Sequence, residues 1–284
     1  MRRKRKSLRK HLLFAWFVAS FAAMASAADQ PACGLHQQFS QTYSISTSGH
    51  LKLKNEIGAV YIRGENRTTI LVEVAETACN KSDLDGIEIH VDSHPQNAER
   101  PDHVDIETRY ARHVRNAVRV EYHVIVPRNI SLDKVSVHDG AIEIADVNGH
   151  IRAKTDQGDV AVDGVQAASQ MGSGHGSVRV IFARLSGGQR ITSVRGDIHV
   201  TLPSDSSVDV EATTGLREIT NDFGIPASDT ARGHALTFRI GQGRAHLEMI
   251  AFAGAIAIVR ADDDKPLSAV VNLSREQPAR SLMD

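Results

Sequence analysis

The acidic side chains are the groups in this chain that come closest to a catalytic pattern. Glu143 with Asp163, and Glu218 with Asp197, are two candidate pairs for an envelope polysaccharide enzyme, which places two carboxylates at a fixed separation. Most acids in the predicted strands alternate outward, as solubilising groups do. All four tyrosines, which could form a sugar platform, precede residue 129. We therefore expect no catalytic residues and no enzyme, with a carbohydrate-active enzyme as the alternative.

The carboxylates and histidines do not show the spacing of metal ligands. Asp139, Asp156 and Asp159 could hold a calcium ion only by converging on it, and aspartate stands at only some of the turns, not at every one as in calcium-binding repeats. Thirteen histidines follow His11, without a His-x-x-x-His pair or a nearby cysteine to complete a zinc site. The sequence therefore predicts no metal and no cofactor.

Two short motifs resemble functional sites but fit a repeat better. The segment 172–177 (GSGHGS) is neither a Gly-x-Ser-x-Gly nucleophile elbow nor a phosphate loop, because it lacks the lysine and a following helix. Arg195-Gly196-Asp197 spells an integrin-binding tripeptide, but Gln157-Gly158-Asp159 stands at the equivalent place two repeats earlier. The Gly-Asp pair is therefore a property of the repeat.

The first 27 residues predict a signal peptide. Seven basic residues lie within Arg2–Lys10, an apolar stretch covers Leu12–Met24, and Ala25-Ser26-Ala27 is a small-x-small cleavage signal. These 13 apolar residues are too short to span a hydrocarbon core of about 30 Å, which favours cleavage over a retained anchor. We expect an exported protein of the periplasm or cell surface, or alternatively an inner-membrane protein with an N-terminal anchor.

Charge and cysteine content agree with export. Without the first 27 residues, 26 basic residues face 34 acidic ones, and this balance argues against a nucleic-acid partner. Cys33 and Cys79 are the only cysteines, and in an oxidising compartment they would pair. Closing that loop would stabilise the fold by about 4 kcal/mol on a chain-entropy model. Two unpaired thiols are the alternative, because spacing alone does not fix geometry.

A pentapeptide, Gly-x-(Ile/Val)-x-(Ile/Val), recurs along the chain. Clear copies start at Gly58, Gly140, Gly158, Gly176, Gly196 and Gly254, and degenerate ones at Gly149, Gly215 and Gly243. From Gly140 to Gly215 the steps are 18, 18, 20 and 19 residues. Such regular spacing is typical of repeat architectures, in which each unit buries its apolar face against its neighbours.

Each repeat predicts a strand, a tight glycine turn and a second strand with one apolar face. Windings stacked about 4.8 Å apart would bury that face, which favours an all-β solenoid; an antiparallel sandwich or meander is the alternative. Less regular strands are expected over residues 28–128, the repeat array over 129–259, and a polar, disordered tail over 260–284. Only 109–116 and 216–222 could form helical turns.

Three segments carry a family resemblance: VIVPRNISLDKVSVHDGAIEI, NGHIRAKTDQGDVAVDGV and VRGDIHVTLP. They resemble the bacterial putative-adhesin family of exported β-strand repeat proteins, long catalogued as a domain of unknown function, over residues 45–260. The resemblance implies a β-helical protein at the cell envelope and supplies no catalytic residues. We therefore expect an adhesin-like or scaffolding module.

The partner of such a module would be a protein or glycan of the envelope. A membrane would be involved only if the signal segment is retained. In that case, the protein would be a membrane-anchored component of an envelope-stress signalling system, which is the alternative to an interaction module and to a carbohydrate-active enzyme.

Overall fold

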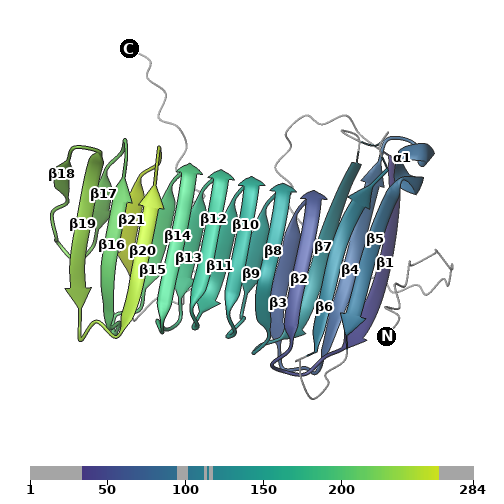
Figure 1. Cartoon of the computed structure of the whole chain (residues 1–284), viewed down its shortest axis with the longest axis horizontal. Helices are drawn as coiled ribbons and strands as arrows, with labels where there is room; N and C mark the ends of the chain where they lie inside the picture. Colours follow the sequence, from purple (N-terminus) through teal and green to yellow (C-terminus); the bar gives the residue numbers. More distant parts are fainter. Residues whose placement is uncertain (1–33, 95–101, 112–113, 115–117, 262–284) are drawn as a thin grey trace, which may run out of the picture.

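The protein consists of two large β-sheets packed face to face (Figure 1). The computed structural model describes residues 34–94, 102–111, 114 and 118–261. The predicted signal peptide, Cys33 and residues 262–284 of the predicted tail lie outside the described residues. The all-β prediction is confirmed, and the predicted array and the strands before it belong to the same two sheets.

Sheet A has eleven strands. From one end to the other they are β18 (Ser228–Thr230), β19 (Gly233–Ile240), β16 (Val208–Thr214), β20 (Ala245–Ala251), β14 (Gly188–Arg195), β12 (Ser169–His175), β10 (Ile151–Gln157), β8 (Ser131–Asp139), β2 (His50–Ile57), β6 (His103–Tyr110) and β5 (Ile87–His94).

Sheet B has ten strands. In the opposite listing direction they are β1 (Leu35–Ser44), β4 (Thr69–Ala78), β7 (Val118–Pro127), β3 (Val60–Glu65), β9 (Ile142–Ala145), β11 (Val160–Val165), β13 (Val178–Phe182), β15 (Ile198–Leu202), β21 (Ile256–Arg260) and β17 (Ile219–Asn221).

One winding is a strand of sheet A, a tight turn and a strand of sheet B. Neighbouring windings pair in parallel and in register, so that Val160 lies opposite Val178 and Val178 opposite Ile198. Antiparallel pairs occur only toward the two ends, for example β1 with β4 and β16 with β19. The predicted solenoid is therefore confirmed, and the antiparallel meander is wrong for the repeat array.

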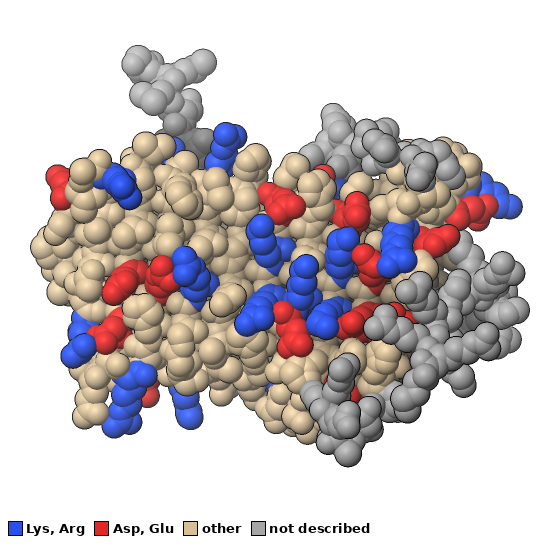
Figure 2. All heavy atoms as spheres, viewed as in Figure 1, with Lys and Arg blue, Asp and Glu red and all other residues tan. Residues whose placement is uncertain are grey.

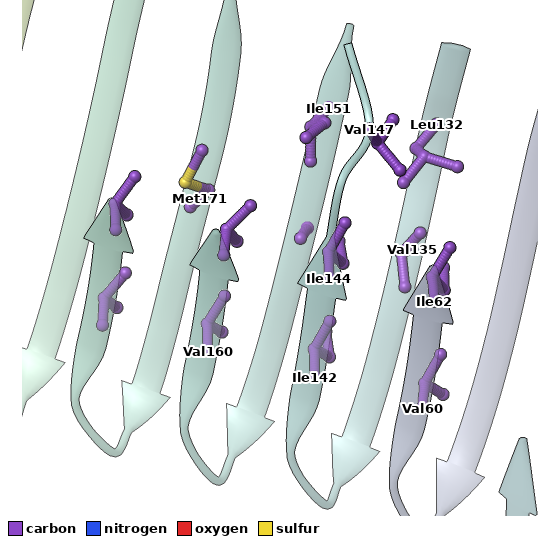
Figure 3. Packing of buried hydrophobic residues seen from close by; sticks show 14 of the residues in the cluster. Val60, Ile62, Leu132, Val135, Ile142, Ile144, Val147, Ile151, Val160 and Met171 are labelled. Atoms are coloured by element: carbon purple, nitrogen blue, oxygen red, sulfur yellow. The ribbon is translucent and has the colours of Figure 1, made fainter. Parts of the chain in front are cut away.

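The core is a set of apolar columns between the sheets (Figure 3). Val60, Ile142 and Val160 project from adjacent strands of sheet B toward sheet A, where Leu132 and Ile151 face them. All five are at most 1% exposed. Each such side chain stabilises the fold by about 1.5–3 kcal/mol relative to an exposed one. Because the windings share these columns, no winding could bury its apolar face alone.

The turn glycines form a column of their own. At Gly158, φ is +131°, and a Cβ would lie closer than 3.0 Å to the carbonyl oxygen of Gly140. Such a Cβ would clash in the same way at Gly140, Gly176, Gly196 and Gly254, each against the glycine carbonyl of the neighbouring winding. Glycine is required here because each turn packs directly on the next.

Small polar side chains three residues before the turn satisfy these glycine carbonyls. The hydroxyl of Thr155 donates to Gly140 O (2.8 Å), and that of Ser173 to Gly158 O (2.7 Å). Ser193 and Thr214 make the equivalent bonds in other windings. A buried carbonyl without a partner would cost stability, so this polar column belongs to the architecture of the turns.

The spatial order of the windings departs from the sequence order near the C-terminal end. Strand β20 lies between β14 and β16, and β21 lies between β15 and β17. Thr214 pairs with Ala251 and Ile219 with Ile256. This register puts Arg217 level with Gly254, and Gly215 two residues earlier. The prediction of a turn glycine at Gly215 is therefore corrected: its winding turns at Arg217.

The prediction that only 109–116 and 216–222 could form helical turns is corrected at two places. A short helix, α1 (Lys81–Asp85), follows β4, and its N-cap Asn80 accepts a hydrogen bond from the Asp83 backbone N–H. The 216–222 segment is not a helical turn, because it contains β17, which pairs with β21. The 109–116 segment includes residues outside the described part of the chain.

Candidate functional site

The first predicted acid pair lies on an open sheet surface. Glu143 is opposite Ala161, so Asp163, two residues further on, is its diagonal neighbour on the outer face of sheet B. Burial, followed by the charge of Asp146, raises the pKa of Asp163. Glu143 is exposed. The two carboxylates are near neighbours, but on an exposed strand surface they are not enclosed around a substrate.

The second predicted pair is separated by a winding. Asp197 follows Gly196, whereas Glu218 belongs to the last winding, and the Gly254 winding lies between them. The Asp197 carboxylate accepts a hydrogen bond from the Ala255 N–H (2.8 Å). Asp197 therefore fixes the next turn. This contact explains the Gly-Asp sequence without an integrin-type function.

The predicted calcium candidates serve different local contacts. Asp159 accepts a hydrogen bond from the Ser177 N–H (2.8 Å), as Asp197 does from Ala255. Asp156 lies 3.0 Å from His138 Nδ1 and 3.5 Å from Lys154 Nζ. The hydrogen bond with His138 lowers the pKa of Asp156. Within the described ranges, no three His, Cys, Asp or Glu side chains are grouped for a metal ion.

The outer face of sheet A carries a more distinctive pattern, a cluster of cations beside a cluster of anions (Figure 2). We define the basic cluster as the exposed outward side chains of three adjacent strands: Lys52, Lys54, Lys134, Arg152 and Lys154. The acidic cluster occupies the next two strands toward the end of the sheet: Glu88, Asp92, Asp105 and Glu107. Strand register makes the boundary sharp, since Lys52 is opposite Lys134 on one side and Asp105 on the other.

A groove of about 430 Å³ follows this boundary. Its lining includes Lys52, Lys54 and Lys134 from β2 and β8, and Asp92, Asp105, Glu107 and Arg109 from β5 and β6. The ammonium of Lys54 lies 3.2 Å from Glu107, and Lys52 lies 3.7 Å from Asp105. Arg109, which also lines the groove, lies 2.6 Å from Glu107, so the carboxylates on the β6 side are partly neutralised while Lys134 has no ion-pair partner among the described residues.

Glu107 stays ionised at this boundary. Burial would raise the pKa of its carboxyl group, but hydrogen bonds from Arg109 and Lys54 outweigh that effect and lower it. Lys134 and Arg152 differ from the other cations, because neither forms an ion pair with any described residue. These two charges are available to a ligand.

Sequence reasoning missed this face. The signal was present in the alternation of β2 and β10, where Lys52, Lys54, Arg152 and Lys154 occupy outward positions. Seeing the cluster required the pairing of β2 with both β8 and β6, and residues 58–102 separate β2 from β6 in the chain. The predicted disulfide partner Cys33 lies outside the described residues, so its pairing with Cys79 stays a prediction.

The fold and its surface define a class: an all-β protein of parallel stacked windings with a charged outer face. The chain belongs to the toastrack DUF4097 family, whose model matches residues 45–258. This match confirms the recognised resemblance to a family of β-strand repeat proteins of unknown function.

Two of the solved structures to which the chain is similar are described as adhesion proteins. A putative cell adhesion protein from Clostridium sporogenes is 13% identical, with 79% of this chain and 100% of that one covered and a TM-score of 0.44. A putative adhesin from Bacteroides fragilis is 9% identical, with 79% and 97% covered and a TM-score of 0.32. No curated protein matches the chain. Over the described residues, no helix is long and apolar enough to span a membrane.

Proposed function

We propose that this protein is an exported, non-enzymatic interaction module of the cell envelope, adhesin-like or scaffolding, which binds an acidic partner on the outer face of sheet A. The observation that carries the proposal is the pair of cations without ion-pair partners, Lys134 and Arg152, within the basic cluster beside the groove. The partner is a protein or glycan of the envelope that presents carboxylates or phosphates.

The fold supports this role because it holds the charges at fixed spacing. The strands that carry Lys52, Lys134 and Arg152 are successive neighbours in sheet A, about 4.8 Å apart. Their backbones are hydrogen-bonded to strands on both sides, so little backbone ordering is needed on binding. Preorganised cations give a repeating partner a defined register, and binding energy is not spent on ordering loops.

The arrangement of acids supports a non-enzymatic role. Asp163 and Glu143 lie on an open strand surface, and Asp197 is engaged in a turn. A glycosidase needs two carboxyl groups on either side of the glycosidic bond that it cleaves. One of them must stay protonated so that it can donate its proton to the leaving-group oxygen. Glu107 in the groove has a pKa lowered by its hydrogen bonds from Arg109 and Lys54, so this carboxyl group is poorly suited to proton donation.

A pull-down from an envelope fraction tests the proposal. The bait is the mature protein, compared with the double variant Lys134→Glu/Arg152→Glu. A matched control is Lys81→Glu/Arg244→Glu, which makes the same change in net charge at exposed positions away from the groove. We expect the captured component to be lost with the first variant, kept with the control, and weakened by salt. Equal capture by both variants contradicts the proposed face.

N-terminal sequencing of the native protein tests export separately. The proposal predicts a mature chain that starts at Ala28. Retention of residues 12–28 would favour the anchored alternative.

A further inference from the structure

Exposed apolar side chains gather at one edge of the stack, away from the groove. Among the described residues, five large hydrophobic side chains are exposed, and three of them are Val194 (48%), Leu216 (76%) and Phe252 (61%). We call these three the apolar edge. They belong to the three last windings, where β14, β20 and β16 are successive neighbours in sheet A.

Backbone pairing brings the three residues to the same level. Ser193 is opposite Ala251, and Ala251 is opposite Thr214, so Val194, Phe252 and Gly215 follow in one lateral row. The Ala253 N–H donates to Val194 O (3.1 Å), and the Gly215 N–H donates to Ala251 O (3.0 Å). Leu216 directly follows Gly215 in the turn. The apolar edge therefore lies along a rim at the turn end of sheet A.

Three arginines flank this rim. Arg195 follows Val194, Arg217 follows Leu216, and Arg232 reaches the rim through its backbone beside Gly215. All three are exposed, and none of their guanidinium groups forms an ion pair or hydrogen bond with a described residue.

Three acids lie within three residues of these arginines in the sequence: Asp197, Glu218 and Asp229. Asp197 is held by the Ala255 N–H, and Glu218 is the one exposed acid adjacent in sequence to these arginines. The rim therefore carries three guanidinium groups that form no ion pair with a described residue, in a mature chain with an excess of acidic residues.

We propose that this rim binds the surface of an anionic phospholipid bilayer. Phe252, Leu216 and Val194 would enter the boundary between headgroups and acyl chains, while the arginines bind lipid phosphates, the usual composition of an interfacial membrane site. A fluid bilayer surface can accommodate these exposed side chains without a preformed pocket, which a folded partner would have to provide. The contact needs no signal anchor and is independent of the groove.

The chain provides a clean fluorescent probe for this contact. Its only tryptophan, Trp16, lies in the predicted signal peptide, so Phe252→Trp gives the mature protein a single tryptophan at the rim. Leu35→Trp is the matched control, because Leu35 is also an exposed apolar residue (39%) but lies on β1 at the other end of the stack.

The test is titration with vesicles of phosphatidylglycerol and phosphatidylcholine, and with pure phosphatidylcholine. We expect a blue shift for Phe252→Trp with the anionic vesicles only, and none for Leu35→Trp. Adding Arg195→Gln, Arg217→Gln and Arg232→Gln should weaken binding about five-fold per arginine removed. Flotation of the unaltered mature protein with the same vesicles provides a readout without a substitution.

Several results would overturn the proposal. These are no flotation of the unaltered protein with anionic vesicles, equal shifts at both tryptophans, or binding that survives the triple arginine substitution. The groove variant Lys134→Glu/Arg152→Glu should float like the unaltered protein. Failure of the lipid site can therefore be distinguished from failure of the proposed envelope-binding face.

Discussion

At the scale of single residues, the turn glycines and the polar side chains before them together allow neighbouring turns to pack closely. The glycine allows a close approach of two backbones, and the hydroxyl of Thr155 or Ser173 then satisfies the carbonyl that this approach buries. Neither residue type explains the turn alone. The repeated Gly-Asp pair adds a third contact, since Asp159 and Asp197 bind the next turn's backbone N–H.

Replacing one turn glycine should destabilise the whole protein. Gly158→Ala combines a positive φ with a Cβ that clashes with the Gly140 carbonyl, so we expect a loss of about 3 kcal/mol in the free energy of unfolding. Urea unfolding of the mature protein measures this change. Gly188→Ala is the control, because no atom lies within 4 Å of its added Cβ. Equal stability of both variants would contradict the glycine column.

The buried tyrosines predict a limit of stability at alkaline pH. Burial raises the pKa of Tyr43 to about 12 and raises the pKa values of Tyr110 and Tyr122 further. The pKa of each of these tyrosines is higher in the folded chain than in the unfolded chain. The folded state therefore favours the neutral phenol, and ionisation of the phenol opposes folding. The resulting stabilisation is complete below pH 10 and is lost as the pH rises through 12 and above.

Tyrosinate absorbance measured during a pH titration checks this prediction. In the folded protein, these three residues should not ionise near pH 10, and their ionisation should coincide with unfolding. The chain in concentrated urea is the reference and should titrate near the ordinary value. Ionisation of all four tyrosines near pH 10 with the fold intact would show that the N-terminal core is open to water.

At the scale of elements, the two ends of the stack differ from its middle. The middle is parallel, and the ends switch to antiparallel pairs. At the C-terminal end, the loop after β17 packs Phe223 against Phe238, with their ring centroids 5.4 Å apart, and Arg260 lies over the Phe223 ring. These contacts cover apolar surface that no further winding would bury, as terminal repeats of stacked proteins must do.

The predicted disulfide would secure the other end. Cys79 directly follows β4, and Cys33 precedes β1, which pairs with β4 along its whole length. We expect non-reducing mass spectrometry of the mature protein to find the Cys33–Cys79 cross-link. Cys33→Ala should lower the free energy of unfolding by about 4 kcal/mol on the chain-entropy model.

Cys79→Ala and the double substitution should lower the free energy of unfolding equally, because each removes the same bond. Labelling of either thiol in the folded, unreduced protein would contradict the pairing.

The sequence predicted where the strands of the array lie, but it did not predict which strands pair with one another. Alternation and glycine spacing predicted the strands of the array, because burial of one face imposes a period of two at every winding. The same pattern could not predict that Gly254 stacks on Gly196, since all windings present similar edges. The charged face depends on this neighbour order, and so it was missed. Helix α1 had a visible signal, Asn80 three residues before Asp83, in the form of an N-cap.

At the scale of the whole molecule, one continuous core supports two separate surfaces. The groove lies over β5, β6, β2 and β8, and the apolar edge lies over β14, β20 and β16. Figure 1 shows these strands toward opposite ends of the same sheet. Such a layout would let a protein lie on a membrane with one end while it binds an acidic envelope component near the other.

The order of the windings is the central structural claim, and it can be measured directly. Spin labels on the outer face of sheet B at Glu143 and Ala257 lie four strands apart, and labels at Glu143 and Thr220 lie five strands apart. Double electron–electron resonance should give about 19 Å for the first pair and about 24 Å for the second, before the length of the labels is added. If the windings stacked in the order of the sequence, Thr220 would lie nearer to Glu143 than Ala257 does. A shorter distance to Thr220 would contradict the stack described here.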